Sequence, residues 1–346
     1  MPGLTTFGWM TLTELVNKIV APKTFVLDKL FAPRTRQHLT KSIQVDLKIG
    51  NRKLAPFVKR TQGATVIELN SKTSQFFETP RIRLKKQLSA SDLLFVRAEG
   101  FPTYLGNGQT IATAREQKVA EELLDLKDMT TRRLEWMACQ ALTGAITVTQ
   151  DDLEFTIDFL MPGANKPALQ GNALWSAVAT ADPLANIRAW KLVVQNARGI
   201  VPTMAIARHE VINLLLQNTK VKEILNLRNL SVGSLNTNAQ LSPLGVTFIG
   251  NLEGVDIYEY NESYVSPSNV VTPMIPDDRF ILASPSADNR LHYGAIEDLD
   301  AQQNIAMAFF SKDWIEKDPS AYWLLTESSP LTVPHEPETI VCAKVR

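Results

Sequence analysis

The stretch TAREQKVAEELLDLKDMTTRRLEWMACQALTGA, residues 113–145, contains no proline and no glycine before Gly144. A pattern of this kind predicts one helix of about 32 residues, which would be about 50 Å long. Its apolar residues form a single stripe at spacings of three, four or multiples of these: Val119, Leu123, Leu126, Leu134, Met137 and Ala141. Charged residues occupy the other faces: Arg115, Glu116, Glu122, Asp125, Arg132, Arg133 and Glu135.

The length of this helix needs an explanation, because helices of globular proteins average about 11 to 12 residues. The single stripe predicts a spar that packs on one side and stays polar along much of its length. The heptads are not sustained, which disfavours a coiled coil. A long surface helix of an ordinary enzyme remains an alternative at this point.

Composition describes a globular chain. With 346 residues and 45% apolar content it can bury a core, and its length suggests two or more folding units. No apolar run approaches the roughly 18 residues of a membrane helix, and the N-terminus lacks the features of a secretory signal, so we expect a cytosolic product. The two cysteines, Cys139 and Cys342, form neither a disulfide framework nor a metal-binding spacing, and buried free thiols are expected.

Charge is segregated along the chain although the formal net charge is zero. Residues 18–60 contain eleven Lys and Arg against two Asp, whereas residues 251–346 contain sixteen Asp and Glu against six Lys and Arg. A basic segment can indicate nucleic-acid binding. A basic end and an acidic end on one chain also suit copies that associate with one another.

The remaining sequence divides into four regions. Residues 1–42 have too few apolar residues to close a core and are interpreted as an arm. Alternating apolar and polar residues from position 43 predict a long two-stranded hairpin with its tip near residues 60–64. Because isolated hairpins are marginal in water, this hairpin should lie on another surface. The alternative is a hairpin that folds back on its own domain. Strands and helices then alternate, with helices at 183–199 and 209–227 and a strand at 201–207. The last part is β structure, with strands at 279–283, 291–296, 305–312, 321–327 and 339–345 and a turn at 313–319.

No catalytic or ligand-binding motif emerges. The turn at residues 207–210 lacks the glycines that hold a phosphate, and Gly106–Gly108 follows no buried strand. The four histidines, His38, His209, His292 and His335, are scattered without metal-binding spacing, and no serine-nucleophile signature is present. The acidic pairs Asp277–Asp278 and Glu297–Asp298 are interpreted as solvated loop residues. We therefore expect no enzyme activity, no cofactor and no metal.

The order of these features resembles a known family. Residues 288–338 read DNRLHYGAIEDLDAQQNIAMAFFSKDWIEKDPSAYWLLTESSPLTVPHEPE, and their Tyr-Gly, Asp-Ala-Gln, Lys-Asp-Trp, Asp-Pro and Ser-Ser-Pro-Leu steps resemble the lambda-type E family of phage major capsid proteins. The resemblance extends over nearly the whole chain through the order of its elements, and it implies the α+β Hong Kong 97-like coat fold. It implies an N-arm at 1–42, an E-loop at 43–88 and a P-domain at 89–173 and 275–330 with its spine helix at 113–145. An A-domain is implied at 174–274 and 331–346.

The same resemblance implies a major capsid protein that self-assembles into hexamers and pentamers of an icosahedral head around non-specifically packaged double-stranded DNA. It implies a location in the virion, assembly in the host bacterial cytoplasm, and no membrane. A scaffold or protease, a portal and a decoration protein are expected to be separate chains. Relatives with covalent chainmail join an E-loop Lys to a P-domain Asn; Lys59 and Lys72 could be considered, but no such bond is assigned.

Contacts between subunits are expected where the E-loop meets a neighbour. The candidates are basic residues near the hairpin tip and acidic residues of the P-domain: Lys53, Lys59, Arg60, Asp298, Asp300, Asp313, Glu316 and Asp318. Two alternatives stay open, namely the shell of a cellular encapsulin-type nanocompartment and an unrecognised α/β enzyme. An enzyme would sediment as a small oligomer, whereas a coat protein would form capsomers or particles.

Overall fold

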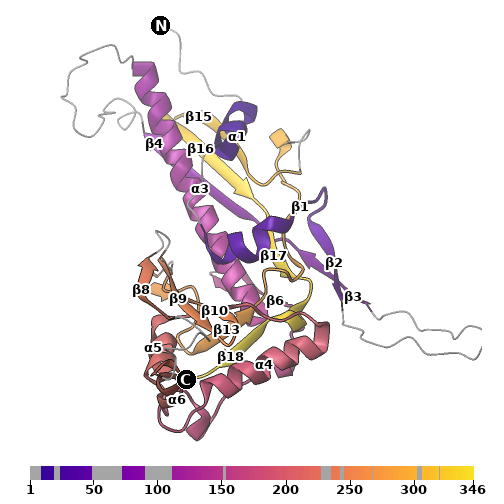
Figure 1. The fold of residues 1–346 in the computed structure, drawn as a ribbon. Coiled ribbons are helices and arrows are strands. Elements are labelled where there is room, and N and C mark those ends of the chain that lie inside the picture. Colours follow the sequence, from indigo (N-terminus) through magenta and orange to yellow (C-terminus); the bar gives the residue numbers. More distant parts are fainter. Residues whose placement is uncertain are drawn as a thin grey trace, which may run out of the picture.

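The computed structural model describes residues 9–18, 24–48, 72–89, 111–150, 153–226, 235–241, 245–266, 268–301, 306–318 and 320–346. The predicted hairpin tip, with Lys53, Lys59 and Arg60, and the Gly106–Gly108 motif lie outside these residues. Figure 1 shows one long helix with sheets beside each half of it and a strand pair that points away from the body.

The long helix is α3, Ile111–Thr143, and the predicted spar is confirmed. It ends because Gly144 adopts a left-handed backbone with φ of 98°, which a side chain would resist. The chain then enters strands β5, Ala145–Gln150, and β6, Leu153–Asp158, which pair as an antiparallel hairpin.

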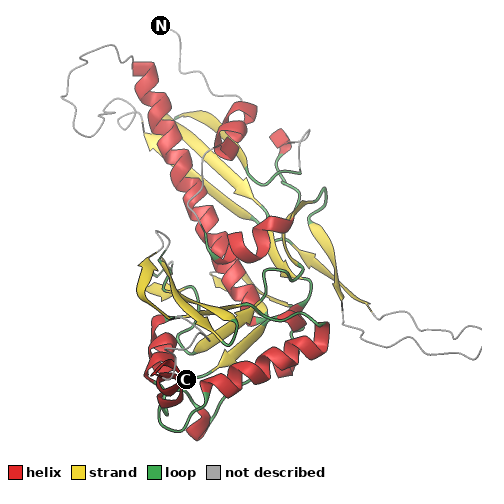
Figure 2. Ribbon diagram, viewed as in Figure 1, coloured by secondary structure: helices red, strands yellow, loops and turns green. Residues whose placement is uncertain are grey.

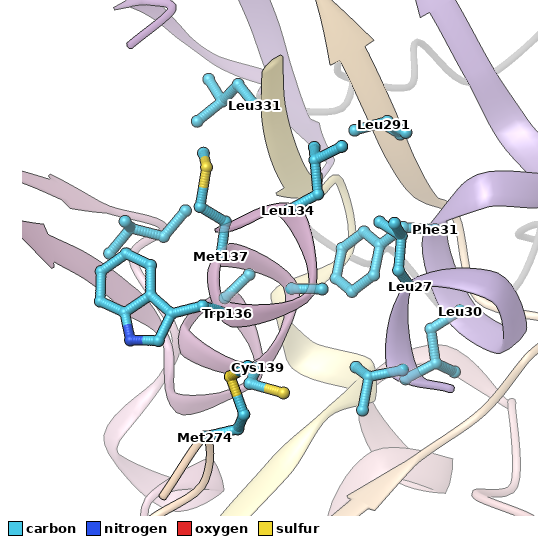
Figure 3. Packing of buried hydrophobic residues seen from close by; sticks show 14 of the residues in the cluster. Leu27, Leu30, Phe31, Leu134, Trp136, Met137, Cys139, Met274, Leu291 and Leu331 are labelled. Atoms are coloured by element: carbon cyan, nitrogen blue, oxygen red, sulfur yellow. The ribbon is translucent and has the colours of Figure 1, made fainter. Parts of the chain in front are cut away.

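The spar is buried more widely than its single apolar stripe predicts. Of residues 130–142, only Arg132 is exposed, and Glu135 is buried although the sequence pattern placed it on a polar face. Figure 3 shows why: Leu134 faces Phe31 of the arm, and Met137 points toward Leu331, which lies on a strand near the C-terminal end of the chain. The expectation of a largely polar surface is therefore wrong for this half, because segments from both chain ends enclose it.

A six-stranded sheet lies at the C-terminal end of α3 in the order β18-β13-β7-β10-β9-β8. Its strands are β7, Met204–Ala207; β8, Leu235–Leu241; β9, Val246–Leu252; β10, Val255–Tyr260; β13, Arg279–Ala283; and β18, Val341–Lys344. Only the β7–β10 pair is parallel. Helices α4, Pro183–Arg198, α5, His209–Gln217, and α6, Thr219–Asn226, gather around this sheet (Figure 2).

Local signals set the ends of these helices. Asp182 caps α4 by accepting a hydrogen bond from the Ala185 N–H at 3.0 Å, and Gly199 ends it with φ of 75°. The single helix predicted over 209–227 is instead divided at Asn218. The side chain of Asn218 accepts from the Lys220 N–H at 3.1 Å and donates to Val178 and Ala181 carbonyls, so it caps α6 and anchors a neighbouring loop.

A second sheet lies along the N-terminal half of α3 in the order β15-β16-β4, with β4 at Ile82–Ser89, β15 at Phe310–Lys317 and β16 at Ser320–Ser328. Helix α1, Trp9–Lys18, packs against β15, and Thr13 exchanges two 3.0 Å hydrogen bonds with the Ser311 backbone. The predicted strand 305–312 and turn 313–319 are wrong in position. Pairing with β16 carries β15 through Lys317, and the Trp314 and Trp323 rings stack across the pair at 6.1 Å.

A third sheet joins both ends of the chain in the order β1-β14-β17, with β1 at Thr35–Gln37, β14 at Asn289–Tyr293 and β17 at Pro330–Pro334. The short π-helix η1, Leu27–Phe31, and the turn η2, Ala32–Arg34, lead into β1. The strand pair that points away from the body consists of β2, Ser42–Lys48, and β3, Lys72–Glu78 (Figure 1). A small hairpin is formed by β11, Ser263–Val265, and β12, Val271–Pro273.

Strand pairing in three places joins segments that belong to different predicted domain ranges. Strand β4 falls within the predicted E-loop but pairs with β16. Strand β13 falls within the predicted P-domain but lies inside the six-stranded sheet, and β17 pairs with β14 rather than joining that sheet. The domain ranges themselves stay a prediction, and local composition does not report which distant strands pair.

Candidate functional site

The projecting β2–β3 pair is fixed to the body at its base. Ile43 and Val45 are buried, and Phe77 meets Phe159 with ring centroids 6.0 Å apart. Thr79, just after β3, shares a 2.9 Å hydrogen bond with Ser329, which ties the base to the end of β16. The next residue toward the tip from Phe77, Phe76, is 73% exposed. The strand pair thus presents an aromatic side chain to solvent from a firmly anchored base.

Beside this base, the structure gathers basic and acidic side chains from four segments, namely β4, β15, β16 and the loop after β14. Arg81 binds Glu327 through two hydrogen bonds of 2.7 and 2.9 Å. Arg83 lies 3.0 Å from Asp298, and Lys312 lies 2.7 Å from Asp298 and 2.8 Å from Asp300. The side chains of Glu327 and Asp298 are 1% and 3% exposed, so these two carboxylates are buried beneath their cations.

The charges in this cluster support one another. Burial favours the neutral form of Asp298, but hydrogen bonds from Lys312 and from the Asp300 N–H outweigh it, so the pKa of Asp298 lies below its usual value. The pKa of Lys312 is raised, because its bonds to the two aspartates outweigh its own burial. Asp298 and Lys312 therefore stay ionised at neutral pH, and the cluster holds β4, β15, β16 and the loop after β14 together.

The predicted acidic contact residues consequently fall into two groups. Asp298 is enclosed within the cluster, and Asp313 accepts a hydrogen bond from the Tyr322 hydroxyl. Asp300, Glu316 and Asp318 remain open to solvent, although Glu316 accepts a 2.6 Å hydrogen bond from the Trp323 indole and Asp300 binds Lys312. Of the five predicted acidic contact residues, Asp300, Glu316 and Asp318 are therefore the exposed ones.

The arm is held by a carboxylate that the sequence analysis placed on a polar helix face. Glu135 of α3 accepts hydrogen bonds from the N–H groups of Phe25, Val26 and Leu27 at 3.2, 2.9 and 2.9 Å. The Tyr260 hydroxyl donates a fourth, at 2.9 Å. These donors are the backbone N–H groups at and just before the start of η1, where a helix leaves N–H groups without a partner in the helix and an anion is favoured. The sequence pattern does not predict this contact, because Glu135 and the N–H groups that it binds in the arm lie about 110 residues apart.

Three of the four histidines, which look scattered in the sequence, come together in the fold. His38 Nε2 lies 2.8 Å from His292 Nδ1, and His292 Nε2 lies 3.0 Å from His335 Nε2. His292 and His335 are buried. The fourth, His209, is exposed and lies 2.9 Å from Glu259 on the six-stranded sheet. The adjacency of β1, β14 and β17 produces this grouping, which their sequence spacing does not predict.

Neither a metal cluster nor a membrane helix is found in the described part of the chain. Among those residues, no group of three or more His, Cys, Asp or Glu side chains is arranged to hold a metal ion. The helices that are described include none with the length and apolar character needed to span a bilayer. Both cysteines are buried free thiols.

The arrangement of arm, projecting strand pair, spine helix and two flanking sheets defines the Hong Kong 97-like class of phage coat proteins. The structure is similar to that of a prophage capsid protein from Escherichia coli CFT073, with a TM-score of 0.69 and 17% identity over 99% of this chain and all of that one. It is also similar to the mature capsid of bacteriophage PhiM1, with a TM-score of 0.51 and 12% identity over 94% of this chain and 88% of that one. These likenesses establish the fold.

The sequence model of the family described as phage major capsid protein E matches residues 8–345, and the chain belongs to this family. It is 24% identical to the major capsid protein of Enterobacteria phage P21 over 92% of this chain and 93% of that protein. It is 28% identical to the major capsid protein of Escherichia phage lambda over 210 residues, which span 59% of this chain and 60% of the lambda protein. The predicted family, fold and structural role are confirmed: this is a major capsid protein of a tailed phage, a component of the virion that assembles into a multimeric shell.

Proposed function

We propose that this chain forms hexameric and pentameric capsomers that close into an icosahedral head around double-stranded DNA, with the β2–β3 strand pair lying on a neighbouring subunit. The observation that carries the proposal is the projecting pair itself. Its described side chains bury their apolar surface only at the base, while Phe76 is 73% exposed. A two-stranded ribbon is marginal alone in water, so a second surface is needed to stabilise it.

Charge and apolar area contribute differently to this contact. The predicted basic residues Lys53, Lys59 and Arg60 belong to the segment between β2 and β3, and the exposed acidic residues beside β15 are Asp300, Glu316 and Asp318. Exposed ion pairs are worth about 0 to 1 kcal/mol each, so apolar contacts such as that of Phe76 supply most of the affinity. The charges set the register and disfavour wrong encounters.

The chain works as a structural component without turnover in this proposal. Acidic pairs that could act as acid and base instead form ion pairs within the chain: Arg208 binds Asp277, and Asp278 lies between Arg279 at 3.3 Å and Lys344 at 3.5 Å. A scaffold or protease, a portal and a decoration protein would be separate chains. Assembly would take place in the bacterial cytoplasm.

The first experiment is gradient sedimentation and electron microscopy of the expressed chain. Capsomers or closed particles support the proposal, whereas a stable small oligomer at all concentrations contradicts it. A cellular nanocompartment shell would also give particles, and genes for cargo enzymes rather than phage packaging beside this one would favour that alternative.

The contact itself is tested by reversing charge in the strand pair. Lys59→Glu with Arg60→Glu should leave circular dichroism unchanged and reduce particle yield at low salt, because like charges then meet across the contact. Lys59→Arg with Arg60→Lys is the matched control and should assemble like the parent. Adding Glu316→Lys and Asp318→Lys to the reversed variant should restore part of the yield. Full yield from the charge-reversed variant at low salt would show that these charges play no part.

A further inference from the structure

A histidine ladder crosses the three-stranded sheet that joins the two ends of the chain. It comprises His38, directly after β1, His292 on β14, and His335, directly after β17. The ring centroids of successive members are 5.1 and 5.2 Å apart, and each contact joins two ring nitrogens at 2.8 or 3.0 Å. The arm strand β1 is thus linked to the C-terminal strand β17 through one buried imidazole.

Counting hydrogens shows what this ladder tolerates. Each nitrogen–nitrogen contact needs one donor and one acceptor, so the two contacts use two protons among four nitrogens. Three neutral rings supply them, with all donors oriented along the ladder in one direction. One added proton is also accommodated, since His292 can donate from both nitrogens. A second added proton on an adjacent ring places N–H against N–H and breaks a contact.

The charged side chains around the ladder further disfavour protonation of its imidazoles. Arg36 on β1 and Arg290 on β14 lie on the same side of the sheet as His292, and both disfavour its protonation. Arg290 is neutralised by Asp288 at 2.7 and 2.8 Å. Beyond His335, Glu336 and Glu338 lie 3.6 and 3.4 Å from Arg198 of α4. Arg34 of η2 donates to the Ala287 carbonyl, and Asp28 and Lys29 of η1 are exposed to solvent.

We propose that the histidine ladder is a proton-operated latch that keeps the arm strand β1 paired with β14 at neutral pH and releases it when a second imidazole is protonated. Strand β1 is short, its three residues are exposed, and it pairs along a single edge with β14. The His38 ring extends that pairing, as does the 2.8 Å hydrogen bond from the His38 backbone N–H to the Tyr293 carbonyl. Arg34 and Thr40, on either side of β1, are bonded to the backbone of Ala287 and Ala295, so the release is a local opening of the short strand between them and leaves the sheets behind it folded.

The direction of the effect follows from burial. Burial, followed by the neighbouring histidines and arginines, lowers the pKa of His292 to about 3, and burial followed by Arg36 also lowers the pKa of His38. The paired state therefore binds fewer protons than the released state between about pH 3 and the ordinary histidine value of about 6.5. Acidification through this window favours release. At pH 5 the release equilibrium should rise by roughly 10- to 30-fold over its value at pH 7.5.

Hydrogen exchange on the full-length, unassembled chain measures this release. After correction for the intrinsic pH dependence of exchange, peptides covering residues 35–38 should lose protection at least about tenfold between pH 7.5 and pH 5. Peptides from α4, which lies outside this sheet, should change little and serve as the internal reference. Equal protection of residues 35–38 at both pH values would overturn the latch. So would an equal loss in α4, since it would indicate general unfolding.

Glutamine variants assign the effect to the ladder, because a glutamine side chain can donate and accept without taking up a proton. His292→Gln should abolish the pH dependence of exchange at residues 35–38. If His292→Gln does not fold, His38→Gln is used in its place and should reduce this pH dependence at least threefold. His209→Gln, at the exposed histidine outside the ladder, is the matched control and should keep the full dependence. The same dependence in all three variants would exclude the ladder. Added protection from Zn²⁺ at pH 7.5 would identify a metal site instead and also overturn the proposal.

Discussion

At the residue scale, buried charged and polar groups connect segments that are distant in the sequence. Glu135 holds the arm, Asp298 holds β4 to the loop after β14, Glu327 binds Arg81 at the start of β4 from β16, and Asn218 holds a loop against α6. Each of these groups has several partners, which is the condition under which a buried charge is tolerated. Glu135 thereby fixes the start of the arm to α3.

The Asp298 cluster gives a prediction with a built-in comparison. Asp298→Asn should lower the free energy of unfolding by about 2 kcal/mol, because Arg83 and Lys312 lose a buried partner. Asp300→Asn, at a side chain that is 57% exposed, should change it by less than about 0.5 kcal/mol. Urea unfolding at pH 7 measures both. Equal effects would show that burial of Asp298 does not decide its contribution.

The pH dependence of this contribution has a definite sign. The pKa of Asp298 is lowered in the folded chain, so its stabilisation is fully present above the unfolded value of about 3.9 and is lost as pH falls through the folded value. The difference between the parent chain and Asp298→Asn should therefore shrink below about pH 4. A difference that stays constant from pH 7 to pH 3 would contradict the ion-pair interpretation.

Gly144 supports a second prediction at this scale. Its φ is 98°, and an added Cβ would lie 2.6 Å from Lys166 Cε and 3.1 Å from Met161 Cβ. Gly144→Ala should destabilise the chain by about 1 to 3 kcal/mol through backbone strain and crowding. Gly163→Ala is the control, since an added Cβ there meets nothing within 4 Å. Thermal unfolding of the two variants should separate them clearly; similar midpoints would rule out the strain argument.

At the element scale, the spine helix α3 organises the molecule. Its N-terminal half lies along the β15-β16-β4 sheet, and its C-terminal half enters the core between the arm and the strands from the chain's end. Lys86 of β4 binds Glu122 and Asp125 of α3, which fixes the sheet to the helix. The helix thereby transmits the position of one sheet to the other through a single rigid element.

Neighbouring leucines on this helix test its orientation. Leu123 is fully buried, whereas Leu124 is 40% exposed. Leu123→Asp should prevent folding, because an unpaired buried carboxylate costs several kcal/mol. Leu124→Asp should give soluble, folded protein. Soluble yield and circular dichroism are the measurements. Folded, fully assembling particles of Leu123→Asp would contradict the placement of this stripe in the core.

At the scale of the whole molecule, the family assigns a shell protein and the geometry describes how copies could engage. The projecting β2–β3 strand pair, the exposed acidic residues beside β15 and the arm all lie outside the six-stranded sheet. The compact α/β unit and the segments proposed to contact neighbouring subunits are therefore separate regions of the chain.

The proposed enclosure of DNA gives a prediction at this scale. A head must hold DNA of any sequence, and the sequence contains no reader motif. Binding to short duplexes should therefore be weak, equal for unrelated sequences, and steeply reduced between low and physiological salt. Fluorescence anisotropy with two duplexes of different composition measures this. Tight binding of one duplex at physiological salt would contradict the expectation of non-specific contact.

The sequence by itself determined the features whose signals are local. The uninterrupted run to Gly144 predicted the spine helix, Asp182 and Gly199 marked the ends of α4, and residues 279–283 matched β13. These succeed because caps and periodicity act within a few residues. The resemblance in residues 288–338 added the family, which neither composition nor spacing could supply.

Only the tertiary structure decided the features that depend on distant partners. The limits of β15 follow from its register with β16, and the burial of Glu135 follows from an arm about 110 residues away. The histidine ladder exists because β1, β14 and β17 lie side by side, and the enclosure of Asp298 exists because Arg83 reaches it from β4. Pairing between distant strands leaves no periodic trace along the chain, so these contacts appear only when the chain is folded.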